Sequence, residues 1–230
     1  MVPLINEPEQ IRQIFDTIAP VYDRLNDQMS FGLHRVWKKM TVAWSGCAAG
    51  SVALDVCCGT GDLAFLLARR TGPTGKVYGV DFSTRQLALA RKRDTQRQII
   101  WQEADALALP FDDRYFDVIT QGFGLRNVLD IPSCLKEMHR VLKPGGRVVI
   151  LDLHRPRDQG WRAFQQWYLN QRVTSLGRAE GLEDEYAYIA PSLERFPTGA
   201  AQVQMARQAG FSQVRHTPLV GETVGVLVAQ

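Results

Sequence analysis

The residues best placed for chemistry are glycines and an aspartate at the ends of two successive predicted strands. The stretch LDVCCGTGDL at 54–63 combines a buried strand, a turn that contains Gly59 and Gly61, and the start of a helix. Glycine is needed in such a turn because the chain bends tightly and approaches a ligand where a β-carbon would clash. Asp81 ends the next predicted strand, KVYGVDFS, at the spacing typical of an acidic residue that binds ribose hydroxyls. These residues predict a site for a nucleoside.

Two kinds of nucleoside ligand fit an acidic residue at this position. A dinucleotide needs a third glycine and a positive potential for its pyrophosphate, whereas this turn has two glycines followed by Asp62. S-adenosylmethionine carries a sulfonium and an amino group, which carboxylates attract. The third predicted strand ends in EADALALPF, where Asp105 can accept a hydrogen bond from the adenine amino group, although it could also cap a turn. The sequence favours S-adenosylmethionine, with a nicotinamide dehydrogenase as the alternative.

The elements that must position these residues alternate between strand and helix. Between Ser51 and Leu153, short β-rich runs alternate with amphipathic stretches, which predicts a parallel sheet with helices on both faces. Ser83 and Gln86 form a capping-box pattern, and KPGG at 143–146 is typical of a helix end that turns into a strand. Two runs near the end, SQVRHTPLV and ETVGVLVAQ, predict an antiparallel hairpin at the sheet edge.

Length and composition predict a single domain. The chain has 230 residues, of which 45% are apolar and 22% charged, which suits one well-filled core. We expect an N-terminal helical cap at 1–45, because Ile11, Ile14, Phe15 and Ile18 have helical spacing. The ligand-binding core is then expected at 46–153, and substrate-side helices with the hairpin at 154–230.

Charge and cysteine usage exclude several classes of function. The net charge is +3, with 27 basic and 24 acidic residues interspersed, which argues against nucleic acid as a partner. The four cysteines form no CxxC pair, so we expect a reducing compartment and neither a disulfide framework nor a metal site. The first ten residues show no apolar signal region and no run is long enough to cross a bilayer. We therefore expect a cytoplasmic protein, with contact at a membrane surface left open.

Four stretches of the chain resemble the class I methyltransferases, and more narrowly the C-methyltransferases of menaquinone, phylloquinone and ubiquinone synthesis. They are YDRLNDQMSFGLHRVWK at 22–38, FGLRNVLD at 123–130, HRVLKPGGRVVILDL at 139–153 and YIAPSLERFP at 188–197. The resemblance implies an α/β Rossmann-like fold: a seven-stranded, mostly parallel sheet with helices on both faces, an antiparallel C-terminal edge hairpin and an N-terminal helical cap. The CCG form of the turn is similar to enzymes of cyanobacteria and plastids that act on demethylphylloquinone. It favours 2-phytyl-1,4-naphthoquinol as the methyl acceptor over demethylmenaquinol, a ubiquinone precursor or another phenolic or lipid acceptor.

The resemblance and the turn together imply a set of residues that bind S-adenosylmethionine. In many relatives a serine stands at the position of Gly122, so a side-chain contact is missing there. The expected donor-binding residues are Asp55, Cys57, Gly59, Thr60, Gly61, Asp81, Phe82, Asp105, Ala106, Gly122 and Tyr22.

Methylation at carbon requires an electron-rich ring, which a reduced quinol provides and an oxidised quinone does not. The candidates for handling the quinol proton or stabilising its oxyanion are Arg126, Asn127, His34 and His154, with Asp152 and the tyrosines as further possibilities. Resemblance favours Arg126 and Asn127, and since arginine stays protonated we expect Arg126 to act electrostatically. The alternatives are a surface ion pair for Arg126 and an ordering role in the cap for His34. We expect Tyr22, Asp23, Asn26 and Ser30 to close over both substrates.

A prenyl tail requires a long apolar channel. Such a substrate resides in membranes, so we expect transient contact with a bilayer surface, and a homodimer is left open. The residues that could line the channel, or alternatively form ordinary core, are Phe31, Leu33, Trp37, Trp161, Phe164, Trp167, Tyr168, Tyr188 and Phe196.

Overall fold

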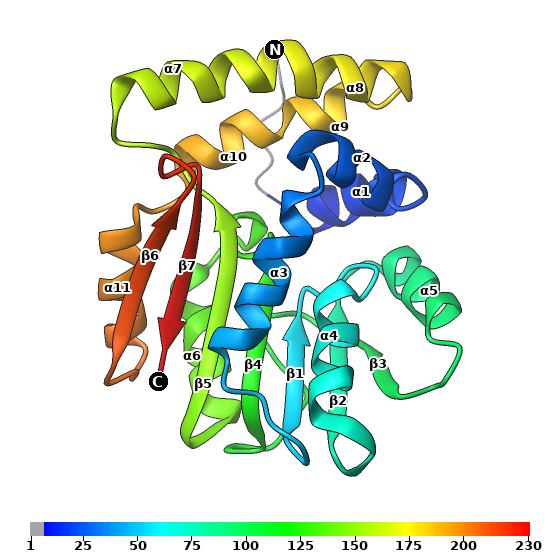
Figure 1. Cartoon of the computed structure of the whole chain (residues 1–230), viewed down its shortest axis with the longest axis vertical. Helices are drawn as coiled ribbons and strands as arrows, with labels where there is room; N and C mark the ends of the chain where they lie inside the picture. Colours follow the sequence, from blue (N-terminus) through cyan, green and yellow to red (C-terminus); the bar gives the residue numbers. More distant parts are fainter. Residues whose placement is uncertain (1–6) are drawn as a thin grey trace.

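A seven-stranded sheet forms the centre of the protein, for which a computed structural model describes residues 7–230. The strands are β1 (Val52–Val56), β2 (Lys76–Asp81), β3 (Ile99–Glu103), β4 (Phe116–Gly122), β5 (Leu142–Leu153), β6 (Val214–Leu219) and β7 (Val224–Ala229). Their order is β3-β2-β1-β4-β5-β7-β6 (Figure 1). The first five are parallel, and β7 is antiparallel to both of its neighbours. The predicted fold is confirmed, and the predicted hairpin is β6 and β7.

Helices cover both faces because successive strand residues point to opposite sides. Leu54 and Val56 pack in the cluster that includes α6 (Ile131–Val141) and α11 (Gly199–Gln208). Ala53 packs in the cluster on the other face, with α4 (Asp62–Thr71) and Val42 of α3 (Leu33–Trp44). The remaining core helix is α5 (Thr84–Arg93), beside β2 and β3, and two short 3₁₀ turns lie at Gly72–Thr74 and Leu125–Asn127 (η2).

The local signals for helix and strand ends are confirmed in part. Ser83 Oγ accepts a hydrogen bond from the Gln86 backbone N–H at 3.0 Å, as the capping pattern predicts. The Gln86 side chain does not complete the box; it donates instead to the Phe15 carbonyl at 3.3 Å. The KPGG stretch lies within β5, because Phe116 pairs with Leu142 and Val118 with Arg147, which leaves 143–146 as a bulge.

A layer of helices, which we call the cap, lies above the carboxyl ends of the parallel strands (Figure 1). It consists of α1 (Pro8–Ile18), α2 (Tyr22–Ser30), α7 (Gln159–Tyr168), a π-helical turn (Leu169–Val173), α8 (Thr174–Ala179), α9 (Glu183–Ala187) and α10 (Ile189–Arg195). Its own apolar core contains Ile18, Leu25, Val173, Tyr186, Ile189 and Leu193. The predicted N-terminal stripe therefore packs mainly within the cap, much of which comes from the part after Leu153. The first six residues of the predicted cap segment lie outside the described residues.

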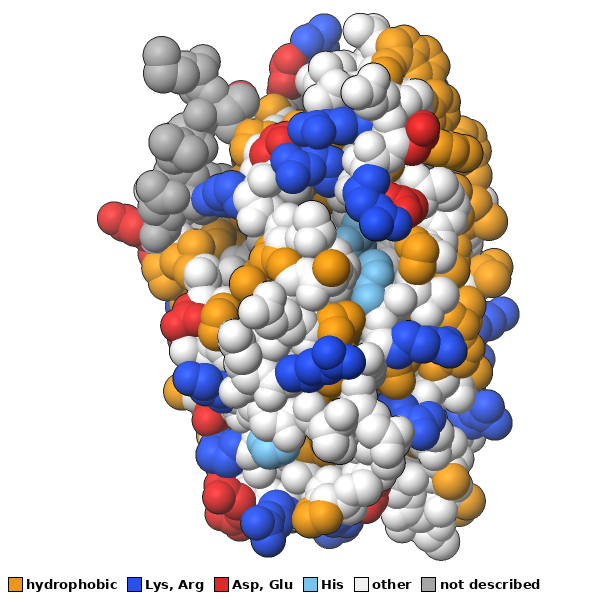
Figure 2. All heavy atoms as spheres, turned by 90° about the vertical axis from the view of Figure 1, so that its left-hand side faces the viewer, with side chains coloured by type: hydrophobic (Ala, Val, Ile, Leu, Met, Phe, Trp, Pro, Cys, Tyr) orange, Lys and Arg blue, Asp and Glu red, His pale blue; other side chains and the backbone are white. Residues whose placement is uncertain are grey.

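The surface is unevenly apolar. In Figure 2, hydrophobic side chains run along one edge of the molecule, most densely toward the upper end, where α7 lies. Within residues 7–230, no helix combines the length and apolar character needed to cross a membrane.

Candidate active site

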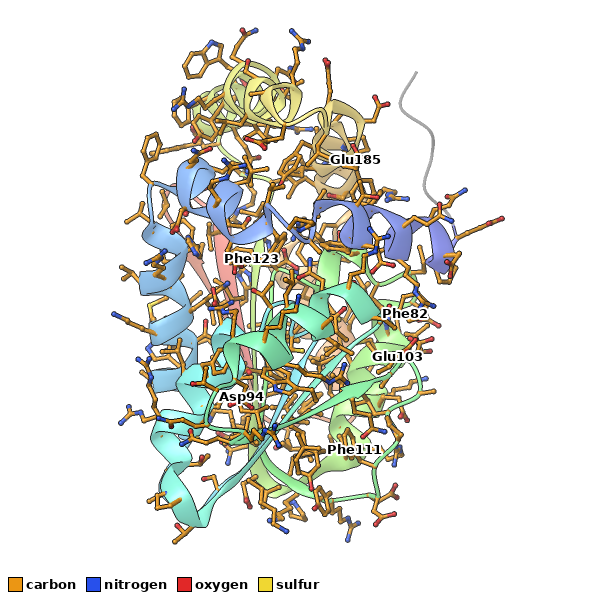
Figure 3. All side chains as sticks on the ribbon, turned by 90° about the vertical axis from the view of Figure 1, so that its right-hand side faces the viewer. Phe82, Asp94, Glu103, Phe111, Phe123 and Glu185 are labelled. Atoms are coloured by element: carbon orange, nitrogen blue, oxygen red, sulfur yellow. The ribbon has the colours of Figure 1, made fainter. Side chains whose placement is uncertain are left out.

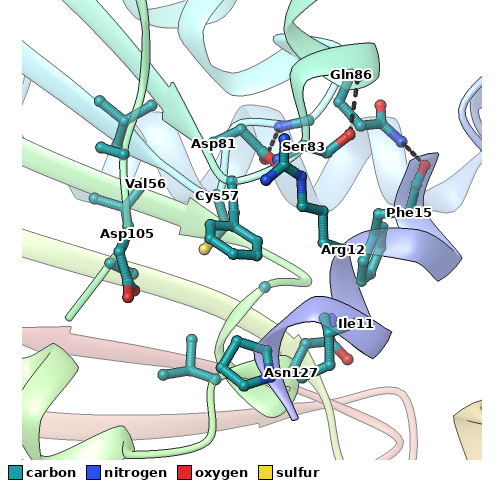
Figure 4. Close-up of a pocket in the computed structure, with 18 of the residues that line it drawn as sticks. Ile11, Arg12, Phe15, Val56, Cys57, Asp81, Ser83, Gln86, Asp105 and Asn127 are labelled. Atoms are coloured by element: carbon teal, nitrogen blue, oxygen red, sulfur yellow. Dashed lines mark hydrogen bonds between the residues drawn. The ribbon is translucent and has the colours of Figure 1, made fainter.

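A cavity opens at the carboxyl ends of β1, β2 and β4, beneath α1 (Figure 4). We call it the strand-end cavity; it has about 920 Å³ of space free of protein atoms, including its open mouth. Figure 4 shows Ile11, Arg12 and Phe15 of α1 on one side and Asp81 on the other. Of the predicted donor-binding residues, the structure brings together here Tyr22, Cys57, Gly59, Asp81, Phe82, Asp105, Ala106 and Gly122, joined by Asn127.

The glycine turn is bent as the sequence requires. Gly59 and Gly61 have φ values of 55° and 93°, in the left-handed region that favours glycine. A β-carbon on Gly61 would lie 2.4 Å from Trp101 Cη2, so this position has no room for a side chain. Gly122 is also crowded, since a β-carbon there would lie 2.7 Å from Leu63 Cδ1. Leu63 thus fills part of the space that a serine would need.

Asp81 lies at the centre of this arrangement. Its Oδ2 accepts from the Gly59 N–H at 2.7 Å and its Oδ1 from the Ser83 N–H at 2.8 Å. Burial raises the pKa of the Asp81 carboxyl. A carboxylate has about four acceptor positions, so each oxygen can also accept from a ligand hydroxyl.

Asp105 marks another part of the same cavity. Its Oδ1 accepts from the Leu107 N–H at 2.9 Å, so it caps a turn as well as lining the cavity. Its exposed carboxylate and the backbone of buried Ala106 provide polar groups well separated from Asp81 in Figure 4.

Three predicted donor-binding residues do not line the cavity: Asp55, Thr60 and Gly61. Asp55 is 1% exposed, and its carboxylate accepts from Thr120 Oγ1 at 2.9 Å and from the Ala64 N–H at 3.1 Å. Burial raises the pKa of Asp55 to about 7. Thr60 Oγ1 donates to Asp23 Oδ1 at 2.7 Å. The Asp55 carboxylate thus supports the start of α4, and Thr60 joins the turn to α2; their contact with the donor stays a prediction.

A second, larger cavity adjoins the first and lies mostly within the cap. We call it the aromatic cavity; it has about 1360 Å³ of free space, including its mouth, and shares Phe15, Tyr22 and Phe123 with the strand-end cavity. Figure 3 shows Phe123 between the sheet and the cap, with Glu185 in the layer above it. The predicted channel residues that line it are Phe31, Leu33, Trp37, Phe164, Tyr168 and Tyr188, whereas Trp161, Trp167 and Phe196 do not.

Arg126 reaches the aromatic cavity from η2, directly after β4. Its Nη1 donates to Asp152 Oδ1 at 2.8 Å and to the Phe123 carbonyl at 2.7 Å, and its backbone N–H donates to Asp152 Oδ2 at 3.0 Å. Burial is the largest influence on the pKa of Arg126 and lowers it, but the charge and hydrogen bond of Asp152, together with Tyr22 and Tyr188, hold the pKa above its usual value. The side chains are 10% and 1% exposed, so a surface ion pair is the wrong interpretation. The buried Nε has no protein partner.

Asn127 follows on the same turn and faces the strand-end cavity instead. Its Nδ2 donates to the Phe123 carbonyl at 3.3 Å, and its buried Oδ1 has no hydrogen-bond partner in the protein. Arg126 and Asn127, which are adjacent in one turn, thus line different cavities: Arg126 the aromatic cavity and Asn127 the strand-end cavity.

The two predicted histidines lie in different places. His34 lines the aromatic cavity, but its Nδ1 is 2.7 Å from Ser30 Oγ and its Nε2 is 3.7 Å from Asp27 Oδ1. Burial lowers the pKa of His34. Both ring nitrogens face polar groups of α2, which favours an ordering role in the cap.

His154 lines neither cavity, so the structure gives its predicted catalytic role no support. Its Nε2 is 3.2 Å from His216 Nε2, and its ring packs against Phe196. Burial and the neighbouring His216 lower the pKa of His154 to about 3. His154 lies outside both cavities because it directly follows the end of β5 and its side chain points toward His216 on β6.

Sequence reasoning missed residues that line or support the cavities. Phe15 lines both, and Arg12 lies 5.3 Å above the Phe82 ring. Lys38 is 8% exposed and donates to Asp62 Oδ2 at 2.9 Å. Asp152, which the sequence already offered as a candidate, pairs with Arg126 at 2.8 Å.

The sheet order and the acidic strand-end cavity define a class I S-adenosylmethionine-dependent methyltransferase. The fold is similar to a SAM-dependent methyltransferase of Aquifex aeolicus, with a TM-score of 0.64 and 19% identity over 97% of each chain. Residues 4–229 match the ubiE/COQ5 methyltransferase family, and the chain belongs to this family.

Two curated relatives share most of the chain. The "2-phytyl-1,4-naphtoquinone methyltransferase" of Nostoc punctiforme is 55% identical over 95% of this chain and 97% of its own. The chloroplastic "2-phytyl-1,4-beta-naphthoquinone methyltransferase" of Arabidopsis thaliana is 46% identical over 95% of this chain and 86% of its own.

Proposed function

We propose that the protein transfers a methyl group from S-adenosylmethionine to the ring carbon beside the phytyl group of 2-phytyl-1,4-naphthoquinol. The observation that carries this proposal is the meeting of the strand-end and aromatic cavities at Phe15, Tyr22 and Phe123. A polar donor and an apolar acceptor can therefore react at a shared wall. The names of the relatives support the acceptor.

The residues of the strand-end cavity fit S-adenosylmethionine. Asp81 has acceptor positions for ribose hydroxyls, Asp105 can accept from the adenine amino group, and the partnerless Asn127 Oδ1 can accept one more hydrogen bond. Carboxylates around a sulfonium are favourable. The group supplies an electrophilic methyl attached to sulfur.

The acceptor must be electron-rich, so the reduced quinol is the reactive form. The new carbon–carbon bond forms as the carbon–sulfur bond breaks, and the proton on that ring carbon is then lost, so a methyl replaces a hydrogen. The aromatic cavity holds the ring and tail, and its apolar walls exclude water. Positioning the two carbons in line supplies much of the rate.

Arg126 has the charge and position to stabilise the quinol oxygen as negative charge develops on it. Its guanidinium is held by Asp152 and the Phe123 carbonyl, and its Nε–H has no protein acceptor. A fixed cation in a dry cavity acts more strongly than one in water. Asp152 acts through Arg126 and is a positioning residue.

The test is to incubate the protein with methyl-labelled donor and a panel of demethyl-quinols kept reduced by dithionite. The panel contains 2-phytyl-naphthoquinol, a polyprenyl naphthoquinol and a prenylated benzoquinol. We expect the highest kcat/KM for the phytyl compound and no turnover of the oxidised quinones. Preference for another head group or tail would overturn the acceptor assignment, and equal turnover of the oxidised form would overturn the mechanism.

A further inference from the structure

Among the described residues, large apolar side chains are exposed at one end of the folded molecule. Nine are prominent, and seven of them come from three segments: the α2–α3 turn with the start of α3, helix α7, and the β6–β7 turn. We call these seven the collar: Phe31, Leu33, Val36, Trp161, Phe164, Trp167 and Val220.

The three segments form one continuous surface. Along α7, the Phe164 ring lies 6.0 Å from Trp161 and 5.9 Å from Trp167. Tyr168, 6.2 Å from Phe164 and 6.4 Å from Phe31, connects α7 to the α2–α3 turn. Gly221, next to Val220, packs directly against the Trp161 indole. The dense hydrophobic edge in Figure 2 lies at this end of the molecule.

The collar surrounds the mouth of the aromatic cavity. Phe31, Leu33, Phe164 and Val220 line that cavity and are nevertheless 73%, 44%, 49% and 46% exposed. Side chains that both line a cavity and face solvent mark its opening. Trp161, Trp167 and Val36 extend the same surface outward without lining the cavity.

The turn that presents Phe31 is built at some conformational cost. Phe31 has φ 51°, a left-handed value that is uncommon outside glycine, and Gly32 follows with φ 75°. Tyr168 Oη donates to the Met29 carbonyl at 2.8 Å and fixes this turn to α7. An aromatic side chain held outward in such a backbone needs a role that repays exposing it.

The charges near the collar indicate what it contacts. Arg155 and Arg162 pair with Glu194, Arg157 with Glu222 and Arg178 with Glu183. Three glutamates thus offset most of the charge of four arginines, and Arg172 near Tyr168 adds a cation without an ion pair to any described residue, so the region has a small excess of positive charge beside a larger apolar area. Indole and phenyl groups on an amphipathic helix such as α7 partition into the boundary between lipid headgroups and acyl chains.

We infer that the collar inserts into the surface of a lipid bilayer, so that the quinol enters the aromatic cavity directly from the membrane. This inference rests on the proposed function for the identity of the quinol that enters the cavity. Because the contact is mainly apolar, it does not require anionic lipid.

The test measures partition of the full chain onto neutral phosphatidylcholine vesicles by sedimentation. The variant carries Trp167→Ser and Val36→Ser, two collar residues that line neither cavity, and Ile100→Ser on β3 is the matched exposed control. We expect about tenfold or greater loss of partition for the double variant and none for the control. Wild-type binding should persist in about 0.5 M salt, where charges are screened within a few ångströms. Absence of wild-type binding, equal binding by the double variant, or loss of binding in salt would overturn the inference.

A second readout separates docking from catalysis. The double variant should show a raised apparent KM for vesicle-embedded phytyl naphthoquinol and unchanged turnover of a soluble, tail-less naphthoquinol. If the proposed acceptor is wrong, methylation fails in every variant while the difference in vesicle partition remains. If wild type sediments as a dimer that the double variant breaks, and does not bind vesicles, the collar is a contact between two copies of the chain.

Discussion

Replacing Arg126 by alanine should lower turnover strongly and stability moderately, whereas replacing Asp152 by asparagine should cause the larger loss of stability. In Arg126→Ala, Asp152 keeps two backbone donors, because the residue 126 N–H at 3.0 Å and the Leu153 N–H at 2.8 Å remain. In Asp152→Asn, the buried guanidinium loses its counter-ion, and an amide NH₂ must face at least one of these N–H groups.

The magnitudes follow from that difference. Removing one partner of a buried ion pair costs about 3–5 kcal/mol, which we assign to Asp152→Asn. Loss of the Arg126 side chain leaves the Asp152 carboxylate buried without its counter-ion, but two backbone N–H groups still donate to that carboxylate, so we expect a smaller cost of about 1–3 kcal/mol. For turnover, loss of an electrostatic contact to the developing oxyanion should lower kcat about 100- to 1,000-fold in Arg126→Ala.

Equilibrium unfolding in urea at neutral pH gives the stabilities, single-turnover assays with reduced quinol give the rates, and calorimetric titration gives donor affinity. Arg126→Lys is the matched control, since it keeps the charge without the fork of donors. The reasoning is refuted if Arg126→Ala keeps kcat within tenfold, if donor affinity falls as much as kcat, or if Asp152→Asn is the more stable variant.

Three further predictions test other parts of the site. Asp81→Ala should weaken S-adenosylmethionine binding about 10- to 100-fold by calorimetry, because hydrogen bonds to a charged group are lost; unchanged affinity in a folded variant would place the ribose elsewhere. Burial lowers the pKa of His154 to about 3 and also lowers the pKa of His216, so the unfolded state binds more protons than the folded state below about pH 6.5. The free energy of unfolding should therefore fall as the pH decreases from about 6.5 toward 3. His154→Gln should flatten this pH dependence in urea titrations, and an unaltered slope would contradict the assignment. Gly61→Ala should lower the unfolding free energy by more than about 1 kcal/mol, since φ is 93° and Trp101 occupies the space, whereas Gly145→Ala, with φ 80° and open space, should cost less; equal costs would show that crowding is unimportant.

The strand-end residues were predictable because topology places them. Parallel strands end at one edge of the sheet, so Asp81, Asp105 and the glycine turn had to meet once the alternation of strand and helix was recognised. Asp55, only a few residues before the turn, does not line this cavity, because adjacent strand residues point in opposite directions and Val56 is the one that faces it. The Asp55 side chain points toward Ala64 and Thr120.

The cap was harder to predict. The N-terminal stripe indicated that Phe15 is buried, but helical spacing does not say what a helix faces. Phe15 lines cavities together with residues of β1, η2 and α9, which lie far along the chain. The place of His154 was hard to predict for a similar reason: a histidine beside a strand end resembles a catalytic base, and only the fold shows that it faces His216.

The two cavities have different exposed residues at their mouths. The exposed residues that line the strand-end cavity are Pro8, Asp105 and Leu129, none of which belongs to the collar. Spent donor could therefore be exchanged with the aqueous phase while the enzyme remains seated on lipid. Successive quinols would then be methylated by lateral diffusion in two dimensions, and the rate would depend on surface density of quinol more than on its bulk concentration.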